Sequence, residues 1–280
     1  MQKRLLAIHD ISCVGKCSLT VALPIISAAG IETSVLPTAV LSTHTGGFKG
    51  YTFRDLTEDI APITAHWKSL NLSIDAIYTG YLGSFEQLFL VENIIRDFKK
   101  PDTLILVDPV MADNGKLYPA FSTEFVSGMR KLCEKADVII PNLTEAAFML
   151  GEEYRESYDR SYIEELLKKL SAIGPKKVVL SGVSLEKGRL GAAAYDRETE
   201  TVSYFFEEQI DGYYHGTGDV FGSALASAVM NGFSLADSTR IAVEYTVGAI
   251  RRTKAAGTDI RYGVDFENEI PHLLRLLGKI

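Results

Sequence analysis

Short apolar runs rich in β-branched residues alternate along the chain with longer segments whose apolar residues recur at helical spacing. The runs predict strands at 4–10, 32–41, 74–80, 102–110, 137–141 and 176–182. The intervening segments predict helices at 17–30, 56–70, 84–100, 122–136, 142–150 and 161–170. Strands that alternate with helices indicate parallel strands joined by crossover helices. The pattern therefore predicts a three-layer α/β/α fold with a doubly wound, mostly parallel sheet.

The last third of the chain departs from this alternation. Two apolar runs, 191–196 and 201–206, flank the polar turn 197–200 and predict an antiparallel hairpin at the sheet edge. Helices are expected at 219–231 and 234–252, and the segment 265–277 closes the chain. Because no repeat or linker interrupts the pattern, a single domain over residues 1–280 is predicted.

Composition narrows the possible classes of protein. The 280 residues are 46% hydrophobic and 23% charged, as in an ordinary globular protein. The net charge of −7 argues against binding to duplex nucleic acid, which requires a basic face. The chain has no signal-like start and no membrane-length apolar stretch, so a cytoplasmic protein without a membrane partner is expected. Its three cysteines are too sparse for a structural zinc site.

Ligands of doubly wound sheets bind beyond the carboxyl ends of the strands. One candidate is the Gly-Thr-Gly-Asp stretch at 216–219, just before a predicted helix. Free N–H groups and the helix dipole favour a phosphate there, and Gly216 and Gly218 would let it approach closely. Asp219 beside an anion suits a general base. The simpler alternative is that its carboxylate caps the helix.

Further polar residues follow the predicted strands. Asp108 ends one strand and Asp113 lies in the next loop; carboxylates near phosphates commonly hold Mg²⁺, although Asp113 also fits a solvated loop. Asn142 and Glu145 lie one helical turn apart and match a capping box as well as a ligand site. Both interpretations of this pair can hold together. Neither a P-loop nor a dinucleotide-binding fingerprint fits the chain.

Taken together, these motifs resemble those of the ribokinase-like superfamily. The stretch 216–219 resembles its G-x-G-D signature, and 142–145 resembles its N-x-x-E motif. Within that group the chain resembles the pyridoxal kinases: STHTGGF (42–48), GYLGSFEQ (80–87) and DPVMAD (108–113) are similar to family blocks. The matches follow the family's order from about residue 5 to 255.

The resemblance implies a kinase of vitamin B6 salvage. Such an enzyme transfers a phosphoryl group from ATP, with Mg²⁺, to the 5-hydroxymethyl group of pyridoxal, pyridoxine or pyridoxamine. Asp219 would be the catalytic base and 216–218 the anion hole, with Thr217 also touching the nucleotide. The other implied ligands on the nucleotide and metal side are Asp108, Asn142, Ser181, Asp113 and Glu145.

The substrate side follows from the same resemblance. Thr45 and Tyr81 would contact the pyridine substituents, His44 would support that loop, and Ser12 would reach the ring nitrogen or hydroxyl. The glycine-rich segment 42–54 resembles a flap that excludes water. A homodimer is the family's habit. The residues themselves indicate neither the oligomeric state nor a need for a monovalent cation.

The first loop departs from the family pattern. DISCVGKCS stands where S-H-V and a later G-N are expected, and Ala112 and Ile140 replace a glycine and a threonine. These changes bear on substrate geometry rather than on phosphoryl transfer. Two alternatives stay open: a hydroxymethylpyrimidine kinase, whose substrate is also a flat heteroaromatic alcohol, and a B6-binding protein without catalysis. The intact Asp219 speaks against the second.

Overall fold

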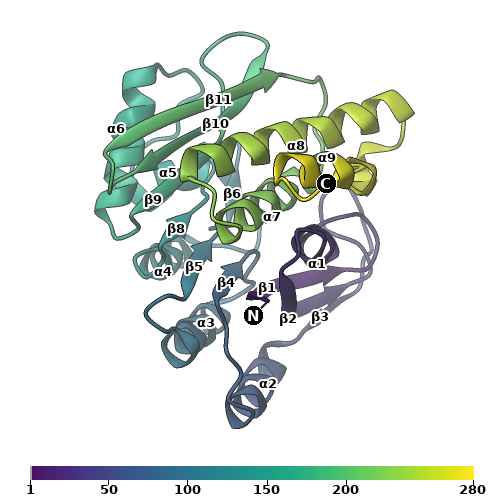
Figure 1. Ribbon diagram of the computed structural model, residues 1–280, viewed down its shortest axis with the longest axis vertical. Coiled ribbons are helices and arrows are strands. Elements are labelled where there is room, and N and C mark those ends of the chain that lie inside the picture. The colour runs from purple at the N-terminus through teal and green to yellow at the C-terminus, as the bar shows by residue number, and fades with distance from the viewer. Residues whose placement is uncertain (1) are drawn as a thin grey trace.

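The computed structural model describes residues 2–280, which fold around a nine-stranded sheet (Figure 1). The strands are β1 (Arg4–Ser12), β2 (Glu32–Leu41), β3 (Phe53–Asp55), β4 (Ala76–Thr79), β5 (Leu104–Val107), β8 (Val138–Ile139), β9 (Lys177–Val183), β10 (Arg189–Asp196) and β11 (Thr201–Glu208). Their order is β11-β10-β9-β8-β5-β4-β1-β2-β3. In this order, the six strands β9, β8, β5, β4, β1 and β2 pair in parallel with one another. The edge strand β3 pairs antiparallel with β2, and β10 pairs antiparallel with both β9 and β11.

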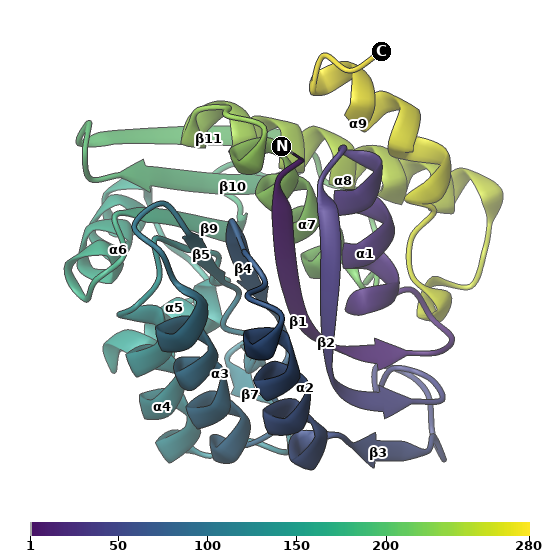
Figure 2. The same ribbon diagram turned by 60° about the horizontal axis from the view of Figure 1, so that its bottom comes forward.

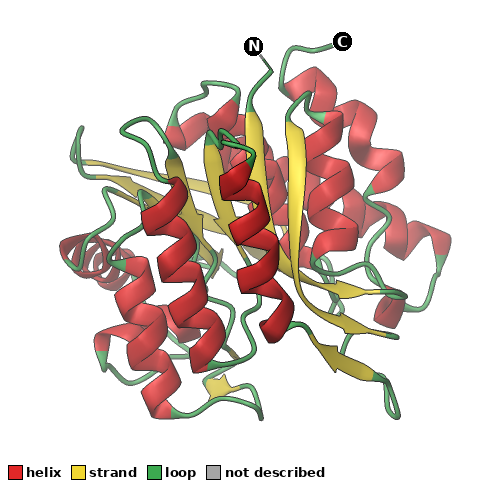
Figure 3. Cartoon of the chain, turned by 90° about the horizontal axis from the view of Figure 1, so that it is seen from below, coloured by secondary structure: helices red, strands yellow, loops and turns green. Residues whose placement is uncertain are grey.

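Side chains alternate between the two faces of this sheet, so each face has its own core. Along β1, Leu5 and Ala7 join one core, and Leu6 and Ile8 join the other. The first core packs beneath α1 (Leu19–Ala28), α7 (Thr217–Met230), α8 (Leu235–Ala256) and α9 (Ile270–Leu276). The second packs beneath α2 (Thr57–Ser69), α3 (Phe85–Phe98), α4 (Thr123–Cys133), α5 (Leu143–Leu150) and α6 (Arg160–Ala172). Figures 2 and 3 show the two helical layers on opposite sides of the sheet.

The predicted three-layer fold is confirmed. Every predicted strand and helix is present, with ends shifted by a few residues, and 191–196 and 201–206 pair as the predicted antiparallel hairpin. Short elements of two or three residues were not predicted: the edge strand β3, the two-stranded β6 (Ala112–Asp113) and β7 (Lys116–Leu117), and the 3-10 turns η1 (Ile260–Tyr262) and η2 (Glu267–Glu269). All three residues of β3 are exposed, so no apolar pattern marks it.

The chain reverses its direction of travel across the sheet next to β1. After β1 it crosses to β2 on one side, and it later returns to β4 on the other. Such switch points open a crevice at the carboxyl ends of the strands. The start of α7 lies there, since Gly216 packs on Lys16 after β1 and Gly222 packs on Tyr78 of β4. Among residues 2–280, no helix has the length and apolar character needed to cross a membrane.

Candidate active site

The entrance of α7 presents free backbone donors. Gly216 is its N-cap residue in the left-handed conformation, with φ 74°, and no described side chain caps this end. The first bond of this helix runs from the Val220 N–H to the Gly216 carbonyl at 3.0 Å. The N–H groups of residues 217–219 therefore have no acceptor within the helix, and they point along its dipole toward the rim. The turn that the sequence predicts to bind an anion therefore offers donors from its backbone alone.

The two glycines of this turn are needed for different reasons. A Cβ on Gly216 would overlap the carbonyl oxygen of Lys16, and its φ also favours glycine. A Cβ on Gly218 would meet no protein atom within 4 Å. Packing therefore does not require glycine at position 218, and the space above it is open. A bare backbone beside open space is what a bound anion needs.

Asp219 lies in the first turn of α7 and keeps partial access to solvent. Desolvation by the surrounding protein raises the pKa of its carboxyl to about 7, and the Ser18 N–H, which favours the ionised form, partly offsets this. The Asp10 carboxylate raises this pKa further. The simpler alternative was that the Asp219 carboxylate caps the helix. Among residues 2–280, no side chain makes a capping bond at this helix start, so capping does not explain the acid.

Asp108 ends β5 at the same rim, with 8% of its surface exposed. An added Cβ on Gly222 would lie 3.7 Å from the Asp108 Oδ2, so the glycine lets α7 approach this acid. Burial, followed by the charges of Glu145 and Asp219, raises the Asp108 pKa well above its usual range. No ion pair among the described residues involves any of these three acids. The charges of Glu145 and Asp219 thus disfavour ionisation of Asp108, as expected for clustered acids without a cation.

Asn142 and Glu145 form the predicted capping box at the start of α5. The Asn142 Oδ1 accepts from the Glu145 N–H at 3.0 Å, and the Glu145 Oε2 accepts from the Asn142 N–H at 2.9 Å. Both side chains also hold the loop after β5. The Glu145 Oε1 accepts from the Met111 N–H at 3.1 Å, and the Asn142 Nδ2 donates to the Ala112 carbonyl at 2.8 Å. This pair therefore fixes the loop that carries Asp108 and Asp113.

Asp113 lies at the end of that loop, and Ser181 lies on the neighbouring strand β9. The Asp113 Oδ2 accepts from the Tyr213 hydroxyl at 2.9 Å, which ties β6 to the segment before α7. Ser181 pairs with Asn142 across a β-bridge, and its hydroxyl donates to the Pro141 carbonyl at 3.4 Å. The structure thus places Asp108, Asp113, Asn142, Glu145 and Ser181 along neighbouring strand ends.

The predicted substrate residues gather at the other end of the rim, near β1. Ser12 is buried at the end of this strand, and Tyr81 is half-buried after β4, with its ring 5.6 Å from that of Phe121. The His44 Nε2 donates to the Arg261 carbonyl at 2.6 Å, because its Nδ1 accepts from the Gly46 N–H at 3.1 Å. Thr45 lies exposed beside His44.

The predicted flap, 42–54, joins β2 to the edge strand β3. Phe48 packs edge-on against His44 and Tyr262, with ring centroids 5.0 and 5.3 Å apart, so the flap lies against η1. The His44 ring also lies 5.0 Å from that of His215, the residue before the anion-binding turn. No sequence signal marked His215. The sequence placed Asp10 on the predicted rim, as an acid at the end of the first apolar run, but assigned it no ligand.

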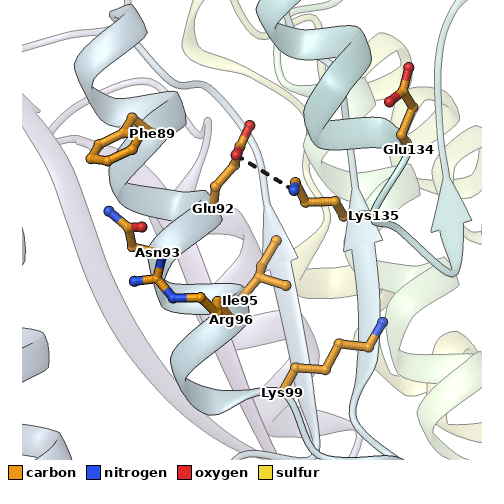
Figure 4. A pocket seen from close by; sticks show the side chains of 8 residues that line it. All are labelled: Phe89, Glu92, Asn93, Ile95, Arg96, Lys99, Glu134 and Lys135. Carbon is orange, nitrogen blue, oxygen red and sulfur yellow. Dashed lines mark ion pairs between the residues drawn. The ribbon is translucent and has the colours of Figure 1, made fainter.

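A surface hollow of about 540 Å³ lies elsewhere, between α3 and the end of α4 (Figure 4). Its lining is mostly polar, and Glu92 and Lys135 pair across it at 3.6 Å. The hollow lies toward the carboxyl ends of these helices, and therefore toward the amino ends of the strands. None of the predicted site residues lines it.

A doubly wound sheet with a glycine-framed anion turn at its switch point defines a ribokinase-like protein. The comparisons with known proteins agree. The chain belongs to the phosphomethylpyrimidine kinase family, whose model matches residues 23–263.

Two solved structures resemble the chain over nearly its whole length, and a curated relative resembles it over about two thirds. A Bacteroides thetaiotaomicron protein with a provisional phosphomethylpyrimidine kinase assignment is 40% identical, with TM-score 0.95 over 97% of this chain and 94% of its own. A second crystal form of that protein contains pyridoxal. The pyridoxal kinase of Lactobacillus plantarum is 33% identical, with TM-score 0.91 over 99% and 98% of the two chains. Bacillus subtilis pyridoxine kinase is 30% identical over 188 residues, 65% of this chain and 66% of its own length.

Proposed function

We propose that the protein is an ATP-dependent kinase of B6 vitamers, which phosphorylates the 5-hydroxymethyl group of pyridoxal, pyridoxine or pyridoxamine. The observation that carries the proposal is the pyridoxal complex of the Bacteroides relative, which is 40% identical and aligned with 98% of this chain. The similarity to pyridoxal and pyridoxine kinases points the same way. The rim supplies an acid and an anion turn side by side, as transfer of a phosphoryl group to an alcohol requires.

Asp219 is the general base of this proposal. Its carboxylate takes the proton of the alcohol as the alcohol oxygen attacks the γ-phosphorus of ATP, and ADP leaves with the electrons of the broken P–O bond. The free N–H groups of 217–219 hold the oxygens of the transferring phosphoryl group, where negative charge accumulates. A pKa of about 7 suits this role, because such a carboxylate is ionised in part and still basic at neutral pH.

Mg²⁺ fits the acids at the nucleotide side of the rim. Asp108, Asp113 and Glu145 offer oxygen ligands, and none of them pairs with a basic side chain among the described residues. No three described His, Cys, Asp or Glu side chains form a ready cage. That arrangement suits Mg²⁺, which keeps several waters and shares phosphate oxygens. When bound, the ion offsets the phosphate charge.

The remaining assignments divide the rim between its two ligands. Thr217 and Ser181, with the loop held by Asn142, would meet the nucleotide, and Ser12, Thr45 and Tyr81 would meet the pyridine. His44 would act through the flap, since both of its ring nitrogens are bonded to backbone groups. The homodimer and the cytoplasmic location stay predictions, and the residues leave open whether a monovalent cation assists. Sedimentation of the purified protein tests the first of these.

One other alcohol kinase activity is favoured by a specific observation. The family model is that of phosphomethylpyrimidine kinase, and a Streptomyces coelicolor relative with 28% identity is a hydroxymethylpyrimidine/phosphomethylpyrimidine kinase. Competition between pyridoxal and hydroxymethylpyrimidine, with Mg-ATP and mass analysis of both products, separates the two functions. We expect kcat/KM to favour pyridoxal. Preferential phosphorylation of the pyrimidine would overturn the proposal.

A further inference from the structure

Asp10 is a buried acid that the proposed phosphoryl transfer does not use. It lies near the end of β1 with 5% of its surface exposed. The Ser18 hydroxyl donates to its Oδ1 at 2.5 Å, and the Ser12 hydroxyl donates to its Oδ2 at 3.3 Å. A carboxylate has about four lone-pair sites, so these two hydroxyl bonds leave acceptor capacity unused.

Asp10 has no cationic partner in residues 2–280. None of the ion pairs there involves it, although Lys16 lies only six positions away and pairs instead with Glu267 at 2.7 Å. The basic side chain that faces it is His44, of the flap. Burial raises the pKa of Asp10, and the two serine hydroxyls favour its ionised form. Burying an acid without a counter-ion is costly, so the site is complementary to a cation or hydrogen-bond donor that arrives with a ligand.

Ser18 connects Asp10 to the proposed base. Its hydroxyl donates to Asp10, while its backbone N–H faces Asp219. Ser18 has φ 57° and ψ −129°, a conformation that a residue with a side chain rarely adopts. Strained backbone of this kind clusters at functional sites, where the surrounding structure enforces it. One enforced residue thus fixes the positions of the two carboxyl groups relative to each other.

Asp10 also lies among the groups that would surround the substrate. Burial raises the pKa of the Cys17 thiol, and the charges of Asp219 and Asp10 raise it further. Burial and then the charge of Asp10 likewise raise the pKa of Tyr81. Its neighbours therefore come from the loop after β1, the loop after β4, the flap and the start of α7. These are the elements that carry the proposed substrate residues Ser12, Tyr81 and His44.

We propose that Asp10 is a specificity-determining residue that hydrogen-bonds the ring nitrogen of the substrate while Asp219 receives the hydroxymethyl group of the same ring. This inference rests on the proposed function. A 3-hydroxypyridine readily carries a proton on its nitrogen and a negative charge on its oxygen, so an anionic acid attracts the nitrogen and repels the oxygen. A neutral Asp10 would donate to an unprotonated nitrogen, so the same two atoms are joined in either protonation state.

The test compares pyridoxine with its carbocyclic analogue, in which C–H replaces the ring nitrogen. For the wild type, kcat/KM should favour pyridoxine on the order of 10- to 100-fold, the range for a hydrogen bond to a charged group. In Asp10→Asn this preference should fall to a few-fold, because an amide can make only a neutral hydrogen bond to the ring nitrogen, while the KM for ATP stays unchanged. Asp55→Asn is the matched control: it removes an exposed acid near Tyr81 whose Oδ1 already accepts from the Thr57 N–H, and it should keep the full preference.

A spectroscopic measurement on the wild type is independent of how any variant folds. The ultraviolet spectrum of bound pyridoxine reports whether its nitrogen is protonated. We expect the protonated form of pyridoxine to persist to higher pH when bound to the wild type than in solution. In Asp10→Asn the bound ring should titrate closer to its pKa in solution. A bound ring that titrates as it does in water, or an unchanged preference in an active Asp10→Asn variant, overturns the role of Asp10 alone. Absence of wild-type turnover on pyridoxal, pyridoxine and pyridoxamine alike overturns the proposed function.

Discussion

Three acids at the amino ends of the strands and two at the carboxyl ends are in opposite circumstances. At the amino ends of the strands they pair with bases: Arg4 with Glu32 at 2.8 Å, Lys68 with Asp97 at 2.7 Å, and Lys176 with Glu198 at 2.7 Å. At the carboxyl ends, Asp10 and Asp219 are desolvated and have no ion-pair partner among the described residues.

This difference indicates that the paired acids serve the stability of the fold and the unpaired acids serve function. Paired charges at the amino ends satisfy one another and need no ligand. Unpaired acids at the carboxyl ends cost folding free energy, and such a cost is characteristic of sites that bind or transform something. Each of the following predictions tests whether the two ends differ in this way.

The largest expected effect comes from Asp219→Asn. Removing the proton acceptor should lower turnover on the order of 10²–10⁴-fold, the range for positioned proton transfer. Nucleotide affinity should be largely preserved, because the N–H groups of the turn belong to the backbone. Steady-state kinetics with pyridoxal and titration calorimetry with ADP measure the two quantities. A turnover number equal to that of the wild type would remove Asp219 from the role of base.

The pH dependence of the wild type should report the same carboxyl group. Burial raises the pKa of Asp219 to about 7, with Asp10 raising it and the Ser18 N–H lowering it. The base is therefore protonated below neutral pH, and kcat/KM should fall as pH decreases, approaching about tenfold per pH unit. Rates at saturating Mg-ATP between about pH 5 and pH 8 measure this limb. A flat profile across that range contradicts it.

Gly218→Ala should separate the anion turn from the fold. The added methyl group meets no protein atom, so stability should stay the same or rise by up to about 1 kcal/mol. Turnover should fall roughly tenfold or more, because the methyl group enters the space of the transferring phosphoryl oxygens. Gly216→Ala provides the contrast, since its Cβ would overlap the Lys16 carbonyl and destabilise the protein. Full activity of Gly218→Ala would show that no anion approaches there.

The smallest effects should have opposite signs at the two ends. Asp97→Asn removes a surface pair with Lys68 and should destabilise by less than about 1 kcal/mol. Asp219→Asn should stabilise at pH 7, because the ionised carboxyl has a folded-state pKa above its unfolded value. Its partial solvent access limits the gain to about 1–2 kcal/mol, and the gain should vanish near pH 4. Denaturant titrations at both pH values measure this, and a destabilised Asp219→Asn at pH 7 contradicts it.

Much of this molecule could be predicted because local patterns decide it. Apolar residues such as Leu5 to Ile8 identify a strand buried on both faces, and Asn142 with Glu145 identifies a helix start. The edge strand β3 could not be predicted, because its pairing with β2 is a tertiary contact between exposed residues.

The candidate site was predictable where a motif occupies consecutive positions. Residues 216–219 suggest an anion site and a base because the glycines and the acid are consecutive in the sequence. The role proposed for Asp10 could not be predicted from the sequence. Its surroundings depend on the unusual backbone of Ser18 and on packing between the first loop and α7. His215 likewise gains significance only through its contact with the flap. Long-range packing, rather than residue type, carries that information.

The close approach of Gly216 to the Lys16 carbonyl joins positions two hundred residues apart in the chain. Contacts with such wide sequence separation form late, since a long loop must close before they contribute energy. A nascent or refolding chain can therefore complete most of its parallel strands while the phosphate cradle is still open. Recovery of kinase activity would then mark the last stage of folding rather than the first appearance of helices.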